Sequence, residues 1–250
     1  MKIIVTENAE AMSKRAAKLF IKKIKRKDRI VLGLATGSTP IGLYQELIKA
    51  YQEGKVDFSN VETFNLDEYY GLAPTHPASY NYFMHNNLFN YINIPENNIH
   101  IPSGIPEEVE EYCEKYENMI KEAGGIDLQL LGIGENAHIG FNEPGTQLGA
   151  TTQLINLADK TIEANSRFFE DKEEVPKKAI SMGIKTIMRA KQIVLLATGE
   201  RKAQAIYNTI KGPVESSVPA SVLQLHPDVT IIVDKPAAKL LNAENVEIDI

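Results

Sequence analysis

Short runs of Val, Ile and Leu recur along the chain, and longer segments that mix apolar and polar positions separate them. The apolar runs cover residues 3–5, 30–34, 61–66, 128–133, 193–197 and 229–233. Runs of this length without polar alternation are typical of strands buried on both faces. Segments with helical periodicity include residues 12–24, 41–51, 109–123 and 202–210. This alternation predicts an α/β fold with an open, mostly parallel, Rossmann-like sheet and helices on both faces.

The chain has no Pro/Gly/Ser-rich linker and no internal repeat that would mark a domain boundary. Its 250 residues are enough for one large α/β core, and 43% hydrophobic with 24% charged residues is ordinary for a globular protein. We therefore predict a single domain over residues 1–250. The polar stretch 158–178 lacks clear periodicity, so we interpret it as a candidate active-site flap.

Charge and cysteine content narrow the classes of function. The formal net charge of −6 argues against a nucleic-acid partner, because phosphate backbones are bound by basic surfaces. Cys113 is the only cysteine, so an intramolecular disulfide is excluded, and no Cys/His spacing resembles a zinc site. No apolar stretch reaches the roughly 20 residues of a membrane span, and the N-terminus lacks signal-peptide features. We expect a cytoplasmic protein with no membrane partner and no metal.

The first candidate site follows the run 30–34, because ligands of open α/β sheets bind beyond the carboxyl ends of the strands. The sequence there is Ala-Thr-Gly-Ser-Thr-Pro. Free amides at a helix start, three hydroxyl groups and a glycine that permits close approach are suited to a phosphate dianion. The residues concerned are Thr36, Gly37, Ser38 and Thr39. The alternative is an ordinary turn in which Ser38 or Thr39 caps the helix.

The second candidate site is Asn-Leu-Asp-Glu-Tyr-Tyr at residues 65–70. Strand alternation places Asn65 and Asp67 on one side and Glu68 on the other. A carboxylate at the end of a sheet, flanked by Leu66 and aromatic residues, is desolvated enough to act as a general base. Asp67 is therefore the candidate base, and its alternative role is a helix or turn cap.

The third candidate site, residues 132–144, combines glycines, an imidazole and a carboxylate within one loop. His138 is suited to proton transfer near neutral pH, and a nearby carboxylate such as Glu143 can hold the ring. The loop also imitates a GxGxxG/A dinucleotide fingerprint, a short pattern with many chance matches. Pro144 and the lack of a clear following helix and strand argue against that interpretation.

The fourth candidate site, Thr-Gly-Glu-Arg-Lys at residues 198–202, again ends an apolar run and opens a helix. Cations in a first helical turn oppose the helix dipole, and a ligand anion would compensate that penalty. Lys202 or Arg201 is therefore a candidate second contact for a phosphate. In the alternative interpretation, Glu200 partly neutralises these cations and no ligand is involved.

At these residues the sequence resembles the glucosamine-6-phosphate deaminase family, within a wider group that includes 6-phosphogluconolactonases and is similar in fold to ribose-5-phosphate isomerases. The resemblance covers nearly the whole chain. It is most specific at residues 33–40, 65–69, 132–144, 165–169 and 223–227. Five matches in the same order are far more specific than any one of them alone.

The resemblance implies isomerisation and deamination of glucosamine 6-phosphate, a small-molecule substrate, without a metal or redox cofactor. It implies that Asp67 moves the proton for enolisation and that His138, supported by Asn136 and Glu143, assists ring opening. It also implies phosphate contacts from residues 36–39, Arg167 and Lys202. Rival interpretations are a 6-phosphogluconolactonase-like hydrolase, which needs no base for a carbon acid, and a non-catalytic sugar-phosphate sensor.

The sequence departs from the family pattern at two places. Asn136 stands where other family members carry aspartate, and an amide can orient a neighbour but cannot ionise. Gln153 and Ile155 stand where allosterically activated relatives carry basic effector contacts. We therefore predict little or no activation by N-acetylglucosamine 6-phosphate. The sequence does not decide between a monomer and a homo-oligomer.

Overall fold

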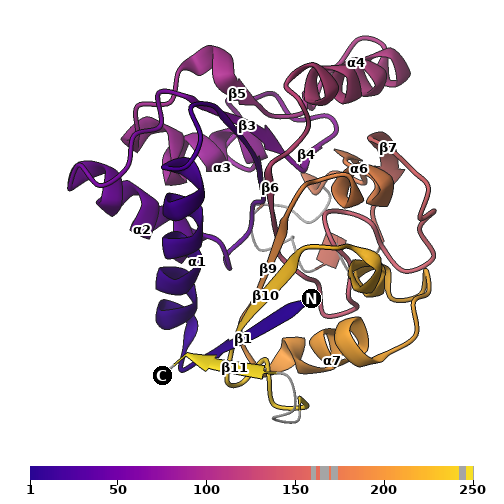
Figure 1. The fold of residues 1–250 in the computed structure, drawn as a ribbon. Coiled ribbons are helices and arrows are strands. Elements are labelled where there is room, and N and C mark those ends of the chain that lie inside the picture. The colour runs from indigo at the N-terminus through magenta and orange to yellow at the C-terminus, as the bar shows by residue number, and fades with distance from the viewer. Residues whose placement is uncertain (159–161, 164–168, 170–173, 242–245, 250) are drawn as a thin grey trace.

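A computed structural model describes residues 1–158, 162–163, 169, 174–241 and 246–249 (Figure 1). Within these residues the apolar runs form parallel strands in the order β11-β1-β10-β9-β6-β2-β3-β5. The strands are β1 (Lys2–Thr6), β2 (Ile30–Leu34), β3 (Val61–Asn65), β5 (Ile99–His100), β6 (Leu128–Leu131), β9 (Ile193–Ala197), β10 (Val229–Asp234) and β11 (Val246–Asp249). The predicted α/β class is confirmed.

Helices cover both faces of this sheet, with α1 and α2 on one side and α6 and α7 on the other (Figure 1). The α-helices are α1 (Ala9–Ile24), α2 (Ile41–Gln52), α3 (Tyr80–Asn87), α4 (Val109–Glu122), α6 (Ile184–Met188) and α7 (Ala203–Lys211). Short 3-10 helices are η1 (Phe89–Tyr91), η2 (Glu96–Asn98), η5 (Glu200–Lys202) and η6 (Pro219–Leu225). The start of α1 is fixed by Asn8, whose side chain accepts a hydrogen bond from the Ala11 N–H at 2.9 Å.

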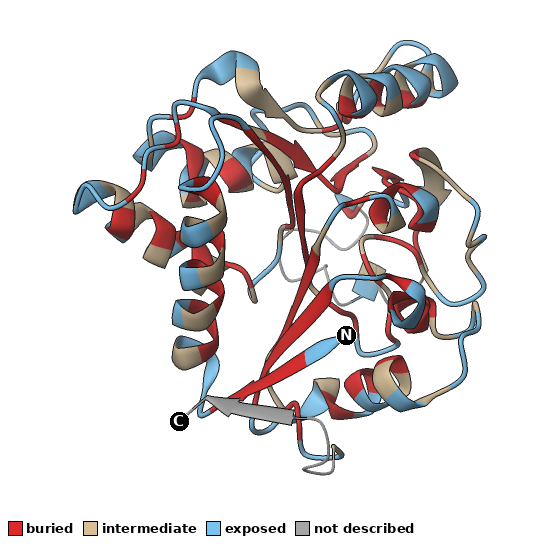
Figure 2. Ribbon diagram, in the orientation of Figure 1, coloured by how far each residue is buried: buried red, intermediate tan, exposed pale blue. Residues whose placement is uncertain are grey.

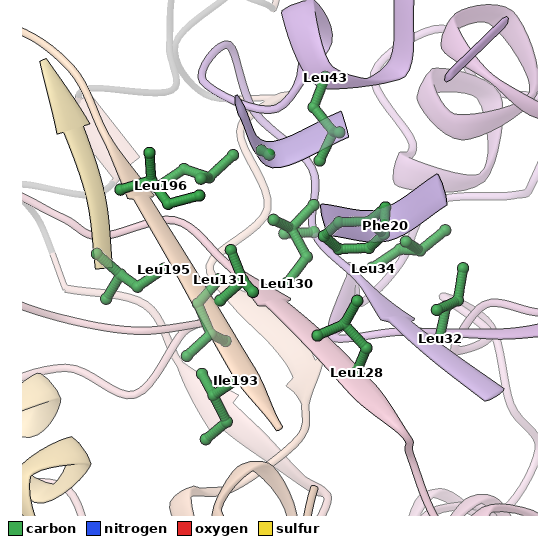
Figure 3. Close-up of a cluster of buried hydrophobic side chains, with 14 of the residues drawn as sticks. Phe20, Leu32, Leu34, Leu43, Leu128, Leu130, Leu131, Ile193, Leu195 and Leu196 are labelled. Carbon is green, nitrogen blue, oxygen red and sulfur yellow. The ribbon is translucent and has the colours of Figure 1, made fainter. Parts of the chain in front are cut away.

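The hydrophobic core lies between the sheet and these helices. All five residues of β2 and all five of β9 are buried, as expected for strands with helices on both sides (Figure 2). Figure 3 shows side chains of β2, β6 and β9 in this core together with Phe20 of α1 and Leu43 of α2. Both helical side chains are fully buried, in agreement with the apolar stripe of each helix.

A second, smaller sheet was not predicted. It is antiparallel, in the order β4-β8-β7, and consists of β4 (Asp67–Tyr69), β7 (Gln153–Asn156) and β8 (Lys178–Ser181). Leu66 joins the two sheets, because its N–H bonds to the Leu34 carbonyl and its own carbonyl accepts from the Met182 N–H. The predicted strands 61–66 and 128–133 accordingly end earlier, at Asn65 and Leu131.

Glu117 of α4 fastens this smaller sheet to the rest of the protein. Its Oε1 accepts hydrogen bonds from the Thr152 N–H and hydroxyl, at 3.0 and 2.6 Å, immediately before β7. The Thr186 hydroxyl of α6 donates to the same oxygen at 2.5 Å. One carboxylate therefore connects α4, α6 and the start of β7.

The order of strands reverses between β2 and β6. The chain passes from β2 to β3 and β5 in one direction, returns to β6, and continues to β9 and β10 in the other. Ligands of open α/β sheets bind at the carboxyl ends of the strands next to such a switch point. All four candidate sites follow strands of the consecutive set β9-β6-β2-β3, so the topology brings them to one edge of the sheet.

Two predictions are left open by the described residues. The candidate flap 158–178 includes residues 159–161, 164–168 and 170–173, which lie outside the description, so it stays a prediction. The single-domain assignment also stays a prediction. In the part of the chain that the structure describes, every helix is too short or too polar to cross a membrane.

Candidate active site

The loop after β2 turns at a glycine with a positive φ and leads into a helix without a side-chain cap. Gly37 has a φ of 95°, which a residue with a side chain adopts only under strain. Helix α2 begins at Ile41 after Pro40, and its first turn receives no hydrogen bond from a capping side chain. The alternative in which Ser38 or Thr39 caps the helix is therefore wrong. The first-turn amides of α2 are available to a ligand.

Asp67 lies at the start of β4 with 6% of its surface exposed, opposite Ser181 of β8. Burial raises the pKa of its carboxyl to about 8, and the negative charge of Glu68 adds to the increase. Its Oδ2 lies 3.5 Å from the position that a Cβ on Gly140 would occupy. Asp67 therefore faces the loop that carries His138, and it is a carboxyl with the pKa of a base that works near neutral pH.

The capping role that was the alternative for Asp67 belongs to Glu68. Its carboxylate accepts hydrogen bonds from the N–H groups of Tyr80 and Asn81 at the start of α3, both at 2.9 Å. A third bond, at 2.8 Å, comes from the Tyr69 N–H. Burial raises the pKa of Glu68 to about 7, although these hydrogen bonds oppose the increase. The two adjacent carboxyl groups thus have separate roles, one structural and one facing the site.

The loop at residues 132–144 holds an imidazole between an amide and a carboxylate. Asn136 Nδ2 donates to Glu143 Oε2 at 2.6 Å, and Asn136 Oδ1 accepts from the His138 N–H at 3.3 Å. His138 Nδ1 lies 3.4 Å from the same Glu143 oxygen, which is longer than a strong hydrogen bond. The three predicted residues are therefore brought together, and the Asn136 amide orients Glu143 without adding charge.

Gly134 is required by the position of the imidazole. A Cβ at residue 134 would overlap with the His138 ring, whereas a Cβ at Gly132 would meet nothing within 4 Å. After these residues the chain continues in turns instead of opening a helix. The dinucleotide fingerprint is therefore a chance match, and the second glycine makes room for a side chain of the same loop.

Polar groups from β8 fix this loop against the strand that carries Asp67. The Phe141 N–H donates to Ser181 Oγ at 3.2 Å, and Ser181 is the cross-strand neighbour of Asp67. Asn142 Nδ2 donates to the carbonyls of Ile139 and Met182 at 2.9 and 2.8 Å. Sequence reasoning missed Ser181, because a lone serine in a weakly patterned segment gives no signal.

Aromatic side chains lie between the loop at residues 36–39 and Asp67. Tyr80 stacks on Phe141 with ring centroids 5.9 Å apart, and it lies 4.8 Å from the Tyr69 ring. The Tyr80 hydroxyl interacts with the hydroxyls of Tyr69 and Thr36, and its buried phenol is close enough to Asp67 to feel that charge. Thr36, Asp67 and the His138 loop therefore meet at one aromatic wall, which the sequence analysis did not identify.

Lys202 ends the 3-10 helix η5 and is partly buried. Desolvation lowers the pKa of its ammonium group, and the Glu135 carboxylate of the His138 loop opposes that change. Glu200 forms an ion pair with Lys239 at 2.7 Å. This contact gives no support to the alternative interpretation in which Glu200 neutralises Lys202. A desolvated cation beside the His138 loop is suited to a ligand anion.

The remaining predicted residue, Arg167, lies outside the described residues. Among the described residues, no cluster of three or more His, Cys, Asp and Glu side chains is arranged to hold a metal. A surface hollow of about 530 Å³ lies at the amino ends of β2 and β3, where Ile30, Val61 and Asp57 line it. That hollow is at the opposite end of these strands from the candidate active site.

Known proteins match the chain over most of its length. A family model described as glucosamine-6-phosphate isomerases/6-phosphogluconolactonase matches residues 5–232. A glucosamine-6-phosphate deaminase of Thermoanaerobacter pseudethanolicus (strain ATCC 33223 / 39E) is 60% identical over 247 residues, which is 99% of this chain and 98% of that protein. One from Clostridium botulinum (strain Kyoto / Type A2) is 57% identical over 242 residues, covering 97% and 99% of the two chains.

Solved structures agree with these matches. A structure described as a monomeric glucosamine-6-phosphate deaminase superposes with a TM-score of 0.94 at 43% identity, covering 96% of this chain and all of the other. A 6-phosphogluconolactonase from Trypanosoma brucei superposes with a TM-score of 0.76 at 18% identity, covering 96% and 98%. The second likeness shows the fold alone. The resemblance stated from the motifs is confirmed.

Proposed function

The chain belongs to the family of glucosamine-6-phosphate isomerases and 6-phosphogluconolactonases, and we propose that it converts glucosamine 6-phosphate and water into fructose 6-phosphate and ammonia. The observation that carries this proposal is a buried carboxyl, Asp67, with a raised pKa beside the loop of His138. An aldose-ketose isomerisation needs a base for a carbon acid, and a base with a pKa near 8 removes such a proton more readily than an exposed aspartate.

The reaction needs two proton-transfer steps. In the first, His138 moves a proton from the anomeric hydroxyl to the ring oxygen, which opens the ring and forms the C1 aldehyde. In the second, Asp67 takes the C2 proton, made acidic by that aldehyde, and the aldehyde oxygen is protonated, which gives an enolamine. Asp67 returns its proton to C1 as the nitrogen loses one, so the enolamine becomes an imine at C2. Addition of water to the imine carbon then releases ammonia and leaves the C2 ketone.

The sugar is held at its phosphate in this proposal. The first-turn amides of α2 and the hydroxyls of residues 36–39 bind the dianion on one side, and Lys202 binds it on the other. Arg167 is included from the resemblance alone. The phosphate fixes the position of the reacting carbons, so that remote binding energy contributes to orientation.

The wider assignments belong to the same proposal. We propose one domain over residues 1–250, a cytoplasmic location and a small-molecule substrate. The net charge of −6 supports the absence of a nucleic-acid partner.

The lactonase alternative is less well supported. Ester hydrolysis requires no base for a carbon acid, whereas Asp67 has the burial and raised pKa of such a base. The identity of 57% and 60% to proteins named as deaminases also supports the deaminase. A silent sensor would have no need for both Asp67 and His138.

The test combines product analysis with one matched pair of variants. Purified protein is incubated with glucosamine 6-phosphate, and ammonium and fructose 6-phosphate are measured separately; 6-phosphogluconolactone is supplied in a parallel assay. We expect both products in equal amounts from the first substrate. Asp67→Asn should remove turnover while the substrate still binds, and Asp57→Asn, an exposed carboxyl at the opposite end of the sheet, should not. Hydrolysis of the lactone without ammonium release would refute the proposal.

A further inference from the structure

The loop at residues 215–221 follows α7, runs into η6 and is closed by one hydroxyl group. Ser221 Oγ accepts a hydrogen bond from the Glu215 N–H at 3.0 Å and donates one to the Glu215 carbonyl at 3.2 Å. The Ser221 side chain is fully buried. Both backbone polar groups of Glu215 are therefore held by one side chain, six residues further along the chain.

One end of this closed loop binds the peptide group in front of His138. The Ala220 N–H, next to Ser221, donates a hydrogen bond to the Ala137 carbonyl at 3.0 Å. The N–H of the same peptide group, which belongs to His138, donates to Asn136 Oδ1 at 3.3 Å. Both polar atoms of this peptide group are therefore held. The orientation of the group sets the direction in which the His138 side chain leaves the backbone.

Ala137 has a backbone conformation that requires such support. Its φ of 64° lies in the left-handed region, and among the described residues it is the only one other than glycine with a positive φ. A side chain makes this conformation unfavourable, and strained residues persist where the surrounding structure holds them in place. The bond from the Ala220 N–H is one of these supports, and the bond from the Ala137 N–H to the Gly134 carbonyl, at 3.1 Å, is another.

The other end of the closed loop binds the chain beyond Glu143. The Ser216 carbonyl, next to Glu215, accepts a hydrogen bond from the Gly145 N–H at 2.8 Å. Gly145 follows Glu143 by two residues. The two contacts therefore lie on either side of the segment that carries the imidazole and its carboxylate. Ser221 fixes the spacing between them, because it ties together the two residues next to which they arise.

We infer that Ser221 is a positioning residue for His138: by closing the 215–221 loop, its hydroxyl holds the imidazole at the Glu143 carboxylate. This inference rests on the proposed function, in which His138 moves the ring-opening proton. His138 Nδ1 already lies 3.4 Å from Glu143 Oε2, so a further displacement loses the contact. Misplacing a reacting group by about 1 Å can lower a rate on the order of a hundredfold.

The remaining supports of the His138 loop do not involve Ser221. The Phe141 N–H stays bonded to Ser181 Oγ of β8 when the Ser221 hydroxyl is removed. The phosphate contacts proposed for residues 36–39 belong to a different loop. Loss of the Ser221 hydroxyl should therefore let the His138 loop shift at its two ends without releasing it. The substrate should still bind while ring opening slows.

The experiment measures kcat and KM for ammonium release in wild type, Ser221→Ala and Ser221→Cys. We expect Ser221→Ala to lower kcat about tenfold and to change KM by less than about twofold, because the groups that bind the phosphate are intact. Ser221→Cys has nearly the same volume but a weaker donor and acceptor, so its kcat should fall by about threefold.

A spectroscopic measurement follows the imidazole directly. The ring 1H–13C signal of His138 is identified by its absence from the spectrum of His138→Gln. We expect one sharp signal in wild type and a broadened or split signal in Ser221→Ala, because the ring no longer has a single orientation. This measurement does not depend on turnover.

Thr6→Val is the matched control. The Thr6 hydroxyl is also buried and also bonds to two backbone groups, the carbonyls of Asn8 and Val233, at 3.2 and 3.1 Å. It lies at the end of β1, which β10 and β9 separate from β6 and the His138 loop. Loss of a buried hydroxyl should lower the free energy of unfolding in both variants. The kcat and the His138 signal should change only in the Ser221 variants.

Three results would overturn the inference: a kcat of Ser221→Ala within about twofold of wild type, a fall in kcat that Thr6→Val shows as well, or an unchanged His138 signal in Ser221→Ala. If Ser221→Ala does not fold, Ser221→Cys decides the matter, and a wild-type kcat in that variant would refute the inference. If wild type itself releases no ammonium, the proposed function has failed instead, and the His138 signal still tests the role of Ser221.

Discussion

Replacing Asp67 by Asn should stabilise the protein, and the gain should grow with pH. Burial holds the pKa of this carboxyl at about 8, against 3.8 for the free side chain. Between these two pH values the folded protein binds a proton that the unfolded chain releases. The contribution of Asp67 to the free energy of unfolding is therefore fully present below the pKa of the unfolded chain, 3.8, and it is lost as the pH rises towards about 8.

The size of the effect follows from the difference in pKa. Each unit corresponds to 1.36 kcal/mol, so about four units give an upper limit of about 6 kcal/mol for the cost of the ionised carboxylate. The asparagine side chain of the variant cannot ionise and avoids that cost. Between about pH 5.5 and about pH 8 the stabilisation by Asp67→Asn should increase by about 3 kcal/mol. A difference between two pH values also cancels changes in packing and hydrogen bonding that are common to both.

The assay is urea unfolding of both proteins at the two pH values, with ΔG taken from the midpoint and the slope. Asp57→Asn is the control, because hydrogen bonds from Ser59 and Asn93 lower the pKa of the Asp57 carboxyl below its ordinary value of 3.8. That carboxyl is ionised in the folded and the unfolded chain at both pH values, so the change in stability caused by Asp57→Asn should be the same at both. A gain from Asp67→Asn that is the same at both pH values would show that the Asp67 carboxyl is not held neutral by burial, and the argument for a tuned base would fail.

Three further predictions follow from single contacts. Gly134→Ala should lower kcat at least about tenfold, because its methyl group displaces the His138 ring, whereas Gly132→Ala should stay within about twofold in the same ammonium assay. Glu117→Leu should lower the free energy of unfolding, measured by urea denaturation, by about 1–3 kcal/mol. The reason is that the Thr152 N–H and the Thr186 hydroxyl lose the hydrogen-bond acceptor that they share. The initial rate should depend hyperbolically on substrate concentration and should not change when N-acetylglucosamine 6-phosphate is added, because Gln153 has no charge with which to bind an effector phosphate. A sigmoidal dependence that becomes hyperbolic when the compound is added would contradict this prediction.

The large sheet could be predicted because its strands are buried on both faces. Such strands are continuous apolar runs, and their identity does not depend on what packs against them. The small sheet could not be predicted, because β4, β7 and β8 are three or four residues long and mix polar with apolar positions. Their pairing is decided by distant segments, such as the bond between Met182 and Leu66.

The candidate site shows the same division. The positions of the Asp67 and His138 loops followed from strand ends, because the topology alone brings those ends together. The division of roles between Asp67 and Glu68 did not follow, because it depends on which carboxyl meets the first turn of α3. Tyr80 was missed for a related reason, since its hydroxyl contacts Thr36 from a helix that the apolar pattern does not mark.

The adjacent carboxyl groups of β4 explain how one short strand serves both structure and chemistry. Side chains of neighbouring strand residues point to opposite sides, so Glu68 holds the start of α3 while Asp67 faces the His138 loop. Burial raises the pKa of both groups, and the charge of Glu68 raises that of Asp67 further. Helix α3 in turn carries Tyr80, whose ring packs against Tyr69 and Phe141 near Asp67. The Glu68 carboxylate that accepts these bonds from the helix therefore also contributes, through its charge, to the basicity of Asp67.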